Sequence, residues 1–196
     1  NNTSWDYAQF EVCAQKWADL SEGNYGVSLL NDCKYGYDIK NNVIRLSLLR
    51  SPTHPDPLAD QGRHTFTYSL LPHENALDKQ TIQQGYFLND PLIVHYDSSQ
   101  KNDHAHCETS LFSVDKSNIV IETIKKAENG KGIIVRLYEC MQNRSPVTLK
   151  AGFKIKNCYL TNLLENNQKQ LQTENDSVEL YFKPYEIVNL RLIPEK

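Results

Sequence analysis

The amino-acid sequence predicts an all-β protein of the antiparallel β-sandwich type: the end of a large sandwich, then a small carboxy-terminal sandwich, with one short helix. Three observations support this fold class. Apolar and polar residues alternate with a period of two in many short segments, as they do in half-buried strands. Turn-forming residues separate these segments, which is typical of antiparallel sandwiches. One long polar stretch divides the chain into two parts.

Five alternating patterns mark the clearest strands. They cover residues 44–48, 66–70, 133–137, 178–182 and 188–192. In each pattern we expect the apolar residues to face inward and the polar ones to face solvent. Asn129-Gly130 is a hairpin signal between two further predicted strands, near 118–126 and 132–139.

The polar stretch at 97–109 lacks large apolar residues and reads as a linker or a long loop. Beyond it, about six short strands are enough for a small sandwich of their own. Before it lie four or five strands, long loops and a helix predicted over 74–86, which ends before Asn89-Asp90-Pro91. This first part is too thin to close a sandwich. We therefore expect it to be the end of a larger domain, and the chain to be a piece of a longer protein.

Composition excludes several classes of function. The formal net charge is -3 and the sequence pI is about 6.1, so the chain has no electrostatic footprint for nucleic acid. No apolar stretch approaches the roughly 20 residues of a membrane span. We expect neither nucleic acid nor a membrane as a partner.

The cysteines indicate a reducing compartment. The chain has five of them with no Cys-x-x-Cys spacing: Cys13, Cys33, Cys107, Cys140 and Cys158. An odd, widely spread set favours buried free thiols over a disulfide framework. Two potential glycosylation sequons, Asn2-Thr3-Ser4 and Asn175-Asp176-Ser177, point the other way, but such tripeptides often arise by chance.

A metal site and a sugar-binding loop are two candidate sites. His104 and His106 would face the same side of a strand, which suits two metal ligands. No further ligands are identifiable, so a solvated loop is the favoured interpretation. In the loop 55–64, Asp60, Gln61 and Arg63 carry groups that bind sugar hydroxyls well. An ordinary polar loop with an internal Asp–Arg pair is the favoured alternative there.

A third candidate precedes that loop. Asn31, Asp32 and Lys34 fit the end of a strand at a tight turn, where Asn and Asp cap their own backbone. Trp17 with Tyr25 and Tyr37 would form either an aromatic surface for a sugar ring or, as we favour, a corner of the core. No phosphate-binding loop, Gly-x-Ser-x-Gly elbow, His-Glu-x-x-His motif or placed carboxylate pair is recognisable. The residues by themselves predict a β-sandwich with no catalytic residues and no metal ligands.

The amino-acid sequences of several segments resemble those of a known protein family. They include WADLSE, NDCKYG and ADQGRH with the following PH, and also IIVRLYE and FKPYEIVNLRL. These segments resemble the carboxy-terminal region of glycoside hydrolase family 38 α-mannosidases, in the branch with the cytosolic animal enzyme, the fungal vacuolar enzyme and many bacterial ones. The similarity runs in order from about Asn2 to about Leu192.

The resemblance implies an enzyme whose chemistry lies elsewhere. Family members are metal-dependent retaining exo-α-mannosidases that release terminal α-linked mannose from oligosaccharides. Their Asp nucleophile and divalent ion, zinc or cobalt, belong to amino-terminal domains that this sequence lacks. Residues 1–108 look like the end of the large sandwich and 109–196 like the small terminal one. The isolated chain is therefore expected to be inactive and to bind no metal.

The resemblance also implies partners and a location. The expected partners are the chain's own catalytic domain and a mannose-containing oligosaccharide, with an oligomeric interface left open. The branch implies a cytoplasmic protein, or a vacuolar one if it is fungal. The alternative to an enzyme part is a stand-alone carbohydrate-binding sandwich.

Site residues carry over from the family by position. In relatives with a different loop sequence, the comparable loop bears an Arg that reaches the substrate-binding face. Arg63 is its counterpart here, with Asp60 and Gln61 as neighbours. Asn31, Asp32 and Lys34 would then support or flank this loop.

Overall fold

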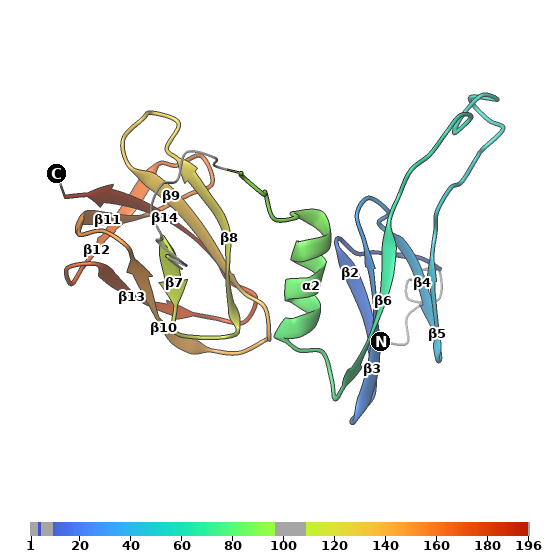
Figure 1. Cartoon of the computed structure of the whole chain (residues 1–196), viewed down its shortest axis with the longest axis horizontal. Helices are drawn as coiled ribbons and strands as arrows, with labels where there is room; N and C mark the ends of the chain where they lie inside the picture. Colours follow the sequence, from blue (N-terminus) through green and yellow to red (C-terminus); the bar gives the residue numbers. More distant parts are fainter. Residues whose placement is uncertain (1–3, 5–9, 97–108, 196) are drawn as a thin grey trace. The chain divides into compact units, whose positions relative to one another are not determined.

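The computed structural model describes residues 4, 10–96 and 109–195. Within it the chain forms two compact units, unit 1 from Asn1 to Asp97 and unit 2 from Ser98 to Lys196. Both consist almost entirely of antiparallel strands, which confirms the predicted all-β sandwich class (Figure 1). The segment around His104, which is a candidate metal site with a solvated loop as the favoured interpretation, lies outside the described residues. No helix in the described ranges is long and apolar enough to cross a membrane.

Unit 1 contains two three-stranded sheets and a helix. One sheet has the order β2-β3-β6 and the other β1-β4-β5. The elements are β1 (Val12–Cys13), β2 (Trp17–Ser21), β3 (Tyr25–Asn31), β4 (Gly36–Lys40), β5 (Val43–Leu46), β6 (Tyr68–Glu74) and α2 (Lys79–Asn89). Helix α2 and the β4–β5 hairpin lie on opposite sides of the β2-β3-β6 sheet (Figure 1).

The alternation along β3 explains this three-layer arrangement. Leu29 faces one side, where it packs with Ala18 and the fully buried Tyr37 of β4 in a small core. Ser28 faces the other side, where its hydroxyl meets that of Thr81 in helix α2 at 2.7 Å. Successive side chains of a strand point to opposite faces, so one strand serves both contacts.

Helix α2 begins later than the sequence indicated. Residue 74 still belongs to strand β6, and Asn75 has a φ of +63°. The helix starts only after Asp78, whose side chain caps it by accepting a hydrogen bond of 2.8 Å from the Gln80 amide. It ends where the Asp90 amide donates to the Tyr86 carbonyl at 2.7 Å, one residue before a proline.

Strand β6 departs from the predicted burial. The alternating pattern at 66–70 led us to expect an inward apolar face, yet Tyr68 is 56% exposed and Leu70 is 64% exposed. Among the described strands β6 pairs only with β3, and the β1-β4-β5 sheet covers the small core at β2 and β3. The apolar face of β6 is therefore uncovered by the described residues of unit 1.

Unit 2 is a closed two-sheet sandwich. A five-stranded sheet has the order β12-β11-β14-β9-β8, and a three-stranded sheet has the order β13-β10-β7. The strands are β7 (Phe112–Val114), β8 (Ile119–Lys126), β9 (Ile133–Glu139), β10 (Ser145–Ala151), β11 (Ile155–Thr161), β12 (Asn167–Leu171), β13 (Ser177–Phe182) and β14 (Ile187–Pro194).

The core of unit 2 comes from the inward faces of both sheets. Val135, Leu149, Phe182 and Leu190 are all completely buried in it. Strands β9, β13 and β14 bury most of the apolar residues of their alternating patterns, as predicted, although Ile133 and Leu180 are only half-buried. The prediction that the polar residues face solvent is wrong for β14, where Asn189 and Arg191 are buried as well. The hairpin signal Asn129-Gly130 does join β8 to β9, through a loop that also contains Gly132.

Candidate functional site

The candidate site is the arm, which we define as residues 50–66. It belongs to the long connection between β5 and β6 that projects from unit 1 (Figure 1). Two hydrogen bonds close its base, because the Asp32 amide donates to the Thr67 carbonyl at 3.2 Å and the Thr67 amide donates to Asp32 Oδ2 at 2.9 Å. The amide of Ser47 donates to Gly36 at 2.9 Å on the other side. The residues that flank the arm are thus anchored to the turn that follows β3 and to the first residue of β4.

Asp60 forms the hydrogen bonds that hold the two sides of the arm together. Its Oδ2 accepts a hydrogen bond of 2.8 Å from the Ser51 amide, which joins the two sides of the arm. Its carbonyl accepts a hydrogen bond of 2.8 Å from His64 Nε2. The Ser51 amide, with smaller contributions from the Arg50 amide and the charges of His64 and Lys34, lowers the pKa of the Asp60 carboxyl. Asp60 therefore acts as an ionised brace.

The segment around Asp56 is closed on itself as well. Asp56 Oδ1 accepts a hydrogen bond of 2.9 Å from the Leu58 amide, and Leu58 in turn accepts one of 3.2 Å from Gln61. The Gln61 side chain donates to the Pro57 carbonyl at 3.3 Å. Asp60 (φ +59°) and Gly62 (φ +124°) then reverse the chain direction, a backbone shape that Gly adopts readily and Asp tolerates.

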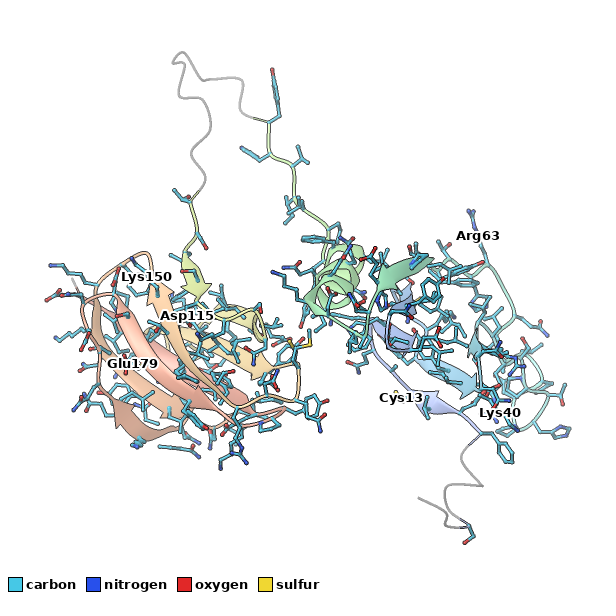
Figure 2. All side chains as sticks on the ribbon, turned by 90° about the horizontal axis from the view of Figure 1, so that it is seen from below. Cys13, Lys40, Arg63, Asp115, Lys150 and Glu179 are labelled. Atoms are coloured by element: carbon cyan, nitrogen blue, oxygen red, sulfur yellow. The ribbon has the colours of Figure 1, made fainter. Side chains whose placement is uncertain are left out.

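Arg63 is left free by this arrangement. It is exposed, and among the described residues no carboxylate or carbonyl pairs with its guanidinium. Figure 2 shows its side chain at the outer margin of unit 1. The structure does not contain the alternative internal Asp–Arg pair. Asp56 and Asp60 each accept a hydrogen bond from a backbone amide, and neither forms an ion pair with Arg63. The arm therefore offers one unpaired cation beside an ionised carboxylate.

Asn31, Asp32 and Lys34 lie at the base of the arm. Asn31 is fully buried; its Oδ1 accepts a hydrogen bond of 2.6 Å from the Lys34 amide, and its amide nitrogen contacts the Tyr37 hydroxyl. The Lys34 ammonium lies 5.0 Å from the centre of the Phe66 ring. The Thr67 amide lowers the pKa of Asp32. The structure thus places Asn31 in the interior, and Asp32 and Lys34 where they hold the arm.

Two other candidates can be placed in part. Tyr37 is in the core of unit 1, whereas Tyr25 is 51% exposed, so these rings form no common platform. The described residues contain no group of three or more His, Cys, Asp or Glu side chains that could hold a metal ion. The four described cysteines are free thiols, but the prediction that they are buried holds only for Cys158, since Cys140 is half-buried and Cys13 and Cys33 are exposed. Cys107 lies outside the described ranges.

Sequence reasoning missed a buried polar network under helix α2. Asp19 Oδ2 is 2.7 Å from His73 Nε2 and accepts a second hydrogen bond of 2.7 Å from the Ser28 hydroxyl. The His73 and Asp19 side chains are only 3% and 7% exposed, and the hydrogen bond to Asp19 raises the pKa of His73. The three residue types match a catalytic triad, but Ser28 bonds to the carboxylate and not to the imidazole. The network therefore activates no nucleophile.

Only the strand register could have revealed this network. It places Asp19 opposite Ser28 and Gly26 opposite His73. Gly26 is required by the same contact, since a Cβ there would lie 2.3 Å from His73 Cε1.

Comparisons with known proteins agree with the sequence resemblance. Residues 1–58 match the glycosyl hydrolases family 38 C-terminal domain, and residues 118–190 match the family 38 C-terminal beta sandwich domain. Human alpha-mannosidase 2C1 is 39% identical over 198 residues, which is 98% of this chain and 19% of that protein. Alpha-mannosidase G of Dictyostelium discoideum is also 39% identical. The alpha-mannosidase of Saccharomyces cerevisiae is 33% identical over 97% of the chain and 19% of its own length.

Solved structures show the same fold. An alpha-mannosidase from Enterococcus faecalis superposes with a TM-score of 0.71 at 22% identity, over 92% of this chain and 21% of that one. A second family 38 structure from the same organism gives a TM-score of 0.71 at 21% identity. The chain thus spans about a fifth of the length of the relatives it matches. With both carboxy-terminal domain models matched in order, the chain belongs to glycoside hydrolase family 38, as part of its carboxy-terminal β-sandwich region.

Proposed function

We propose that this chain is the non-catalytic carboxy-terminal region of an α-mannosidase, called the parent enzyme below, that releases terminal α-linked mannose from oligosaccharides. The main observation in support is that proteins named alpha-mannosidase match 97 to 98% of the chain and are about five times longer than it. The chain supports the catalytic domain of the parent enzyme, which is its principal partner. An oligosaccharide that ends in mannose is the substrate.

The uncovered face of β6 supports the proposed domain assignment. Residues 1–108 are the end of the large sandwich, and 109–196 are the small terminal sandwich. A sheet face bearing Tyr68 and Leu70 exposes apolar area that sandwich domains bury. Further strands of the large sandwich, from elsewhere in the parent enzyme, would cover it. Unit 2 already closes its own core.

The catalytic machinery is assigned to the rest of the parent enzyme. A divalent ion such as zinc or cobalt needs several His, Asp or Glu ligands in one place. The residues that the structure describes contain no such group. Their role is therefore structural support and one wall of the substrate cleft.

The arm is the segment that reaches the cleft. Arg63 donates hydrogen bonds to mannose hydroxyls, while Asp60 and Gln61 keep the arm in shape and Asp32 and Lys34 hold its base. Two features support this role: the guanidinium is unpaired, and the arm is braced independently of it. A charged donor that no other group occupies can bind a ligand without first losing an internal partner.

The compartment follows from the thiols. The described cysteines are unpaired, and Cys158 is fully buried, as in proteins that fold under reducing conditions. We assign the parent enzyme to the cytoplasm, or to the vacuole if it is fungal.

An activity assay with an aryl α-mannoside tests the proposed function. The parent enzyme should hydrolyse it, and the isolated 196-residue chain should not, with or without added zinc or cobalt. Deleting this chain from the parent enzyme should leave little soluble, active protein. Turnover by the purified isolated chain would contradict the proposal, as would full activity of the deleted form.

A further inference from the structure

A polar groove on unit 2 belongs neither to the arm nor to the core. It encloses about 910 Å³, within the range of roughly 300–1,000 Å³ typical of ligand sites. Its floor includes Thr148 of β10 and Glu179 of β13, which lie opposite each other in the sheet. Both face away from the core, because their neighbours Val147 and Val178 are buried in it. Figure 2 labels Glu179 on this unit. We call this space the β13 groove.

The other wall of the β13 groove is a braced connection. It contains Gln170 at the end of β12 and residues 171–174, which lead toward β13. The amides of Glu174 and Ser177 donate to each other's carbonyls at 3.0 and 2.9 Å, and the Ser177 hydroxyl adds a third bond of 2.9 Å. The turn is also tied to the body of unit 2, where Ile155 donates to Asn175 at 2.7 Å. The groove is therefore held in shape without a ligand.

Missing strands do not account for this groove. The core of unit 2 is closed, with Leu149, Val178 and Phe182 at 0 to 1% exposure directly beneath the three-stranded sheet. The groove lies on the outer surface above them, and its lining is polar apart from Leu171. This contrasts with the uncovered face of β6, which is apolar and requires a covering layer.

The side chains in the groove define the chemistry of a ligand. Gln172, Glu174 and Glu179 form no side-chain hydrogen bond or ion pair with the residues that the structure describes. Carboxylates only accept hydrogen bonds, whereas amides and the Thr148 hydroxyl both donate and accept. A ligand rich in hydroxyl groups satisfies all of these at once, because each hydroxyl also donates and accepts.

Other classes of ligand fit less well. No Lys or Arg lines the groove, and the neighbouring Lys150 lies 3.6 Å from Asp176, so a phosphate or sulfate finds no counter-charge. Two carboxylates are too few for a calcium site, which takes six to eight oxygen ligands. A purely hydrophobic ligand would leave the carboxylates and amides of the groove without partners, and Leu171 is the one apolar residue in the lining.

We propose that the β13 groove is a second binding site for a neutral oligosaccharide, with Glu179 and Glu174 accepting hydrogen bonds from sugar hydroxyls and Gln172 donating to them. The site lies on a different unit of the chain from the arm. The choice of a mannose-containing ligand rests on the proposed function, whereas the preference for a neutral polyhydroxylated ligand rests on the groove alone.

An NMR titration of the 196-residue chain with α1,2-linked mannotriose tests this site. The side-chain amide signals of Gln170 and Gln172 should shift on addition of the trisaccharide. Glu179→Gln should weaken the binding by about tenfold or more, since a hydrogen bond to a charged group is lost. Arg63→Ala is the matched control and should leave these shifts unchanged. Thermal unfolding by circular dichroism verifies that each variant is folded.

Three outcomes would overturn the proposal. In the first, mannotriose and the neutral control maltotriose both leave the groove signals unmoved in the folded chain. In the second, the signals shift equally in the wild type and in Glu179→Gln. In the third, a trilysine peptide binds and the trisaccharides do not, which would make the groove an acidic surface for a cationic partner. None of these outcomes affects hydrolysis of an aryl mannoside by the parent enzyme, so failure here is distinct from failure of the proposed function.

Discussion

At the scale of residues, Asp60 and Arg63 differ in their contacts. Asp60 accepts a hydrogen bond from the backbone amide of Ser51, whereas Arg63 has no partner among the described residues. The Ser51 amide also lowers the pKa of the Asp60 carboxyl, so the brace stays ionised at neutral pH. In the proposed function, the shape of the arm depends on Asp60 and the contact with the ligand on Arg63.

Replacing Arg63 by Ala in the parent enzyme should lower kcat/KM by about 10- to 150-fold, if its hydrogen bond to the substrate persists in the transition state. The free energy of unfolding should change by less than about 0.5 kcal/mol, because the side chain is exposed and unpaired. Steady-state kinetics and urea unfolding measure the two effects. Arg45→Ala, which removes an exposed Arg paired with Asp38, is the control. Loss of stability with normal activity would contradict the cleft role.

His73 should make the stability of unit 1 depend on pH. Its pKa is raised above 6.5, chiefly by the hydrogen bond to Asp19. A raised pKa in the folded state means that the stabilisation is complete below about pH 6.5 and is lost as the pH rises through the folded-state pKa. Urea unfolding of the wild type at pH 6 and pH 8.5 should therefore show the higher stability at pH 6.

The variant His73→Gln should lower the stability at pH 6 and flatten this pH dependence. His54→Gln, which changes an exposed residue of the arm, should retain it. Equal pH dependence in His73→Gln and wild type would show that another group is responsible.

At the scale of elements, two glycines in one loop have different roles. Gly130 (φ +72°) and Gly132 (φ +92°) both lie between β8 and β9 in conformations that L-residues rarely adopt. A Cβ on Gly130 would meet nothing within 4 Å, whereas one on Gly132 would lie 2.4 Å from the Leu192 carbonyl of β14. Gly132 is thus needed for backbone contact as well as for turn geometry.

Gly130→Ala should cost about 1–2 kcal/mol in unfolding free energy, the usual cost of a left-handed conformation for an L-residue. Gly132→Ala should cost at least about 1 kcal/mol more, because the strand β14 must also move away. Urea unfolding of the two variants compares them directly. Equal losses would show that the close approach to Leu192 is readily relieved.

At the scale of the whole molecule, the two units differ in completeness. Unit 2 buries a continuous core between its two sheets. Unit 1 has a small core around Tyr37 and leaves Tyr68 and Leu70 of β6 exposed. Leu92, Ile93 and Val94, which follow helix α2, are 87 to 96% exposed. Exposed apolar surface of this extent supports the proposed contact with other parts of the parent enzyme.

Leu70→Ser should therefore have opposite effects in two settings. In the isolated chain it removes exposed apolar area and should reduce self-association, measured by light scattering. In the parent enzyme the proposed large sandwich would cover the same side chain, and its loss should lower the unfolding free energy by about 2–4 kcal/mol, measured by urea unfolding. Leu164→Ser, at a residue 82% exposed in unit 2, should cost less than about 0.5 kcal/mol. An unchanged parent enzyme would contradict the covering of β6.

The alternating patterns predicted β9, β13 and β14 with their buried faces. The sequence similarity of several segments identified the family. Local signals were sufficient there because a period of two determines both the strand and its inward face once a partner sheet exists. The helix was placed five residues too early, because the continuation of β6 through residue 74 depends on pairing with β3.

Within the arm, the residue types were enough to suggest Asp60, Gln61 and Arg63 as a polar group. They could not assign the partner of each side chain. An Asp carboxylate can accept a hydrogen bond from a backbone amide or from a guanidinium, and the sequence does not show which donor lies close to it. The residue types also did not predict that Asn31 is buried. Its side-chain oxygen accepts a hydrogen bond from the Lys34 amide, and its side-chain nitrogen contacts the Tyr37 hydroxyl.

The sequence by itself determined β8, β9, β13 and β14 of unit 2, the family and the polar character of the arm, because these depend on residue order and local geometry. Only the tertiary structure decided that Tyr68 and Leu70 are uncovered, that Asp19 and His73 meet under helix α2, and that Arg63 has no partner among the described residues. Each of these depends on which surfaces and atoms meet across positions distant in the sequence. That is set by sheet register and packing, which no local pattern encodes.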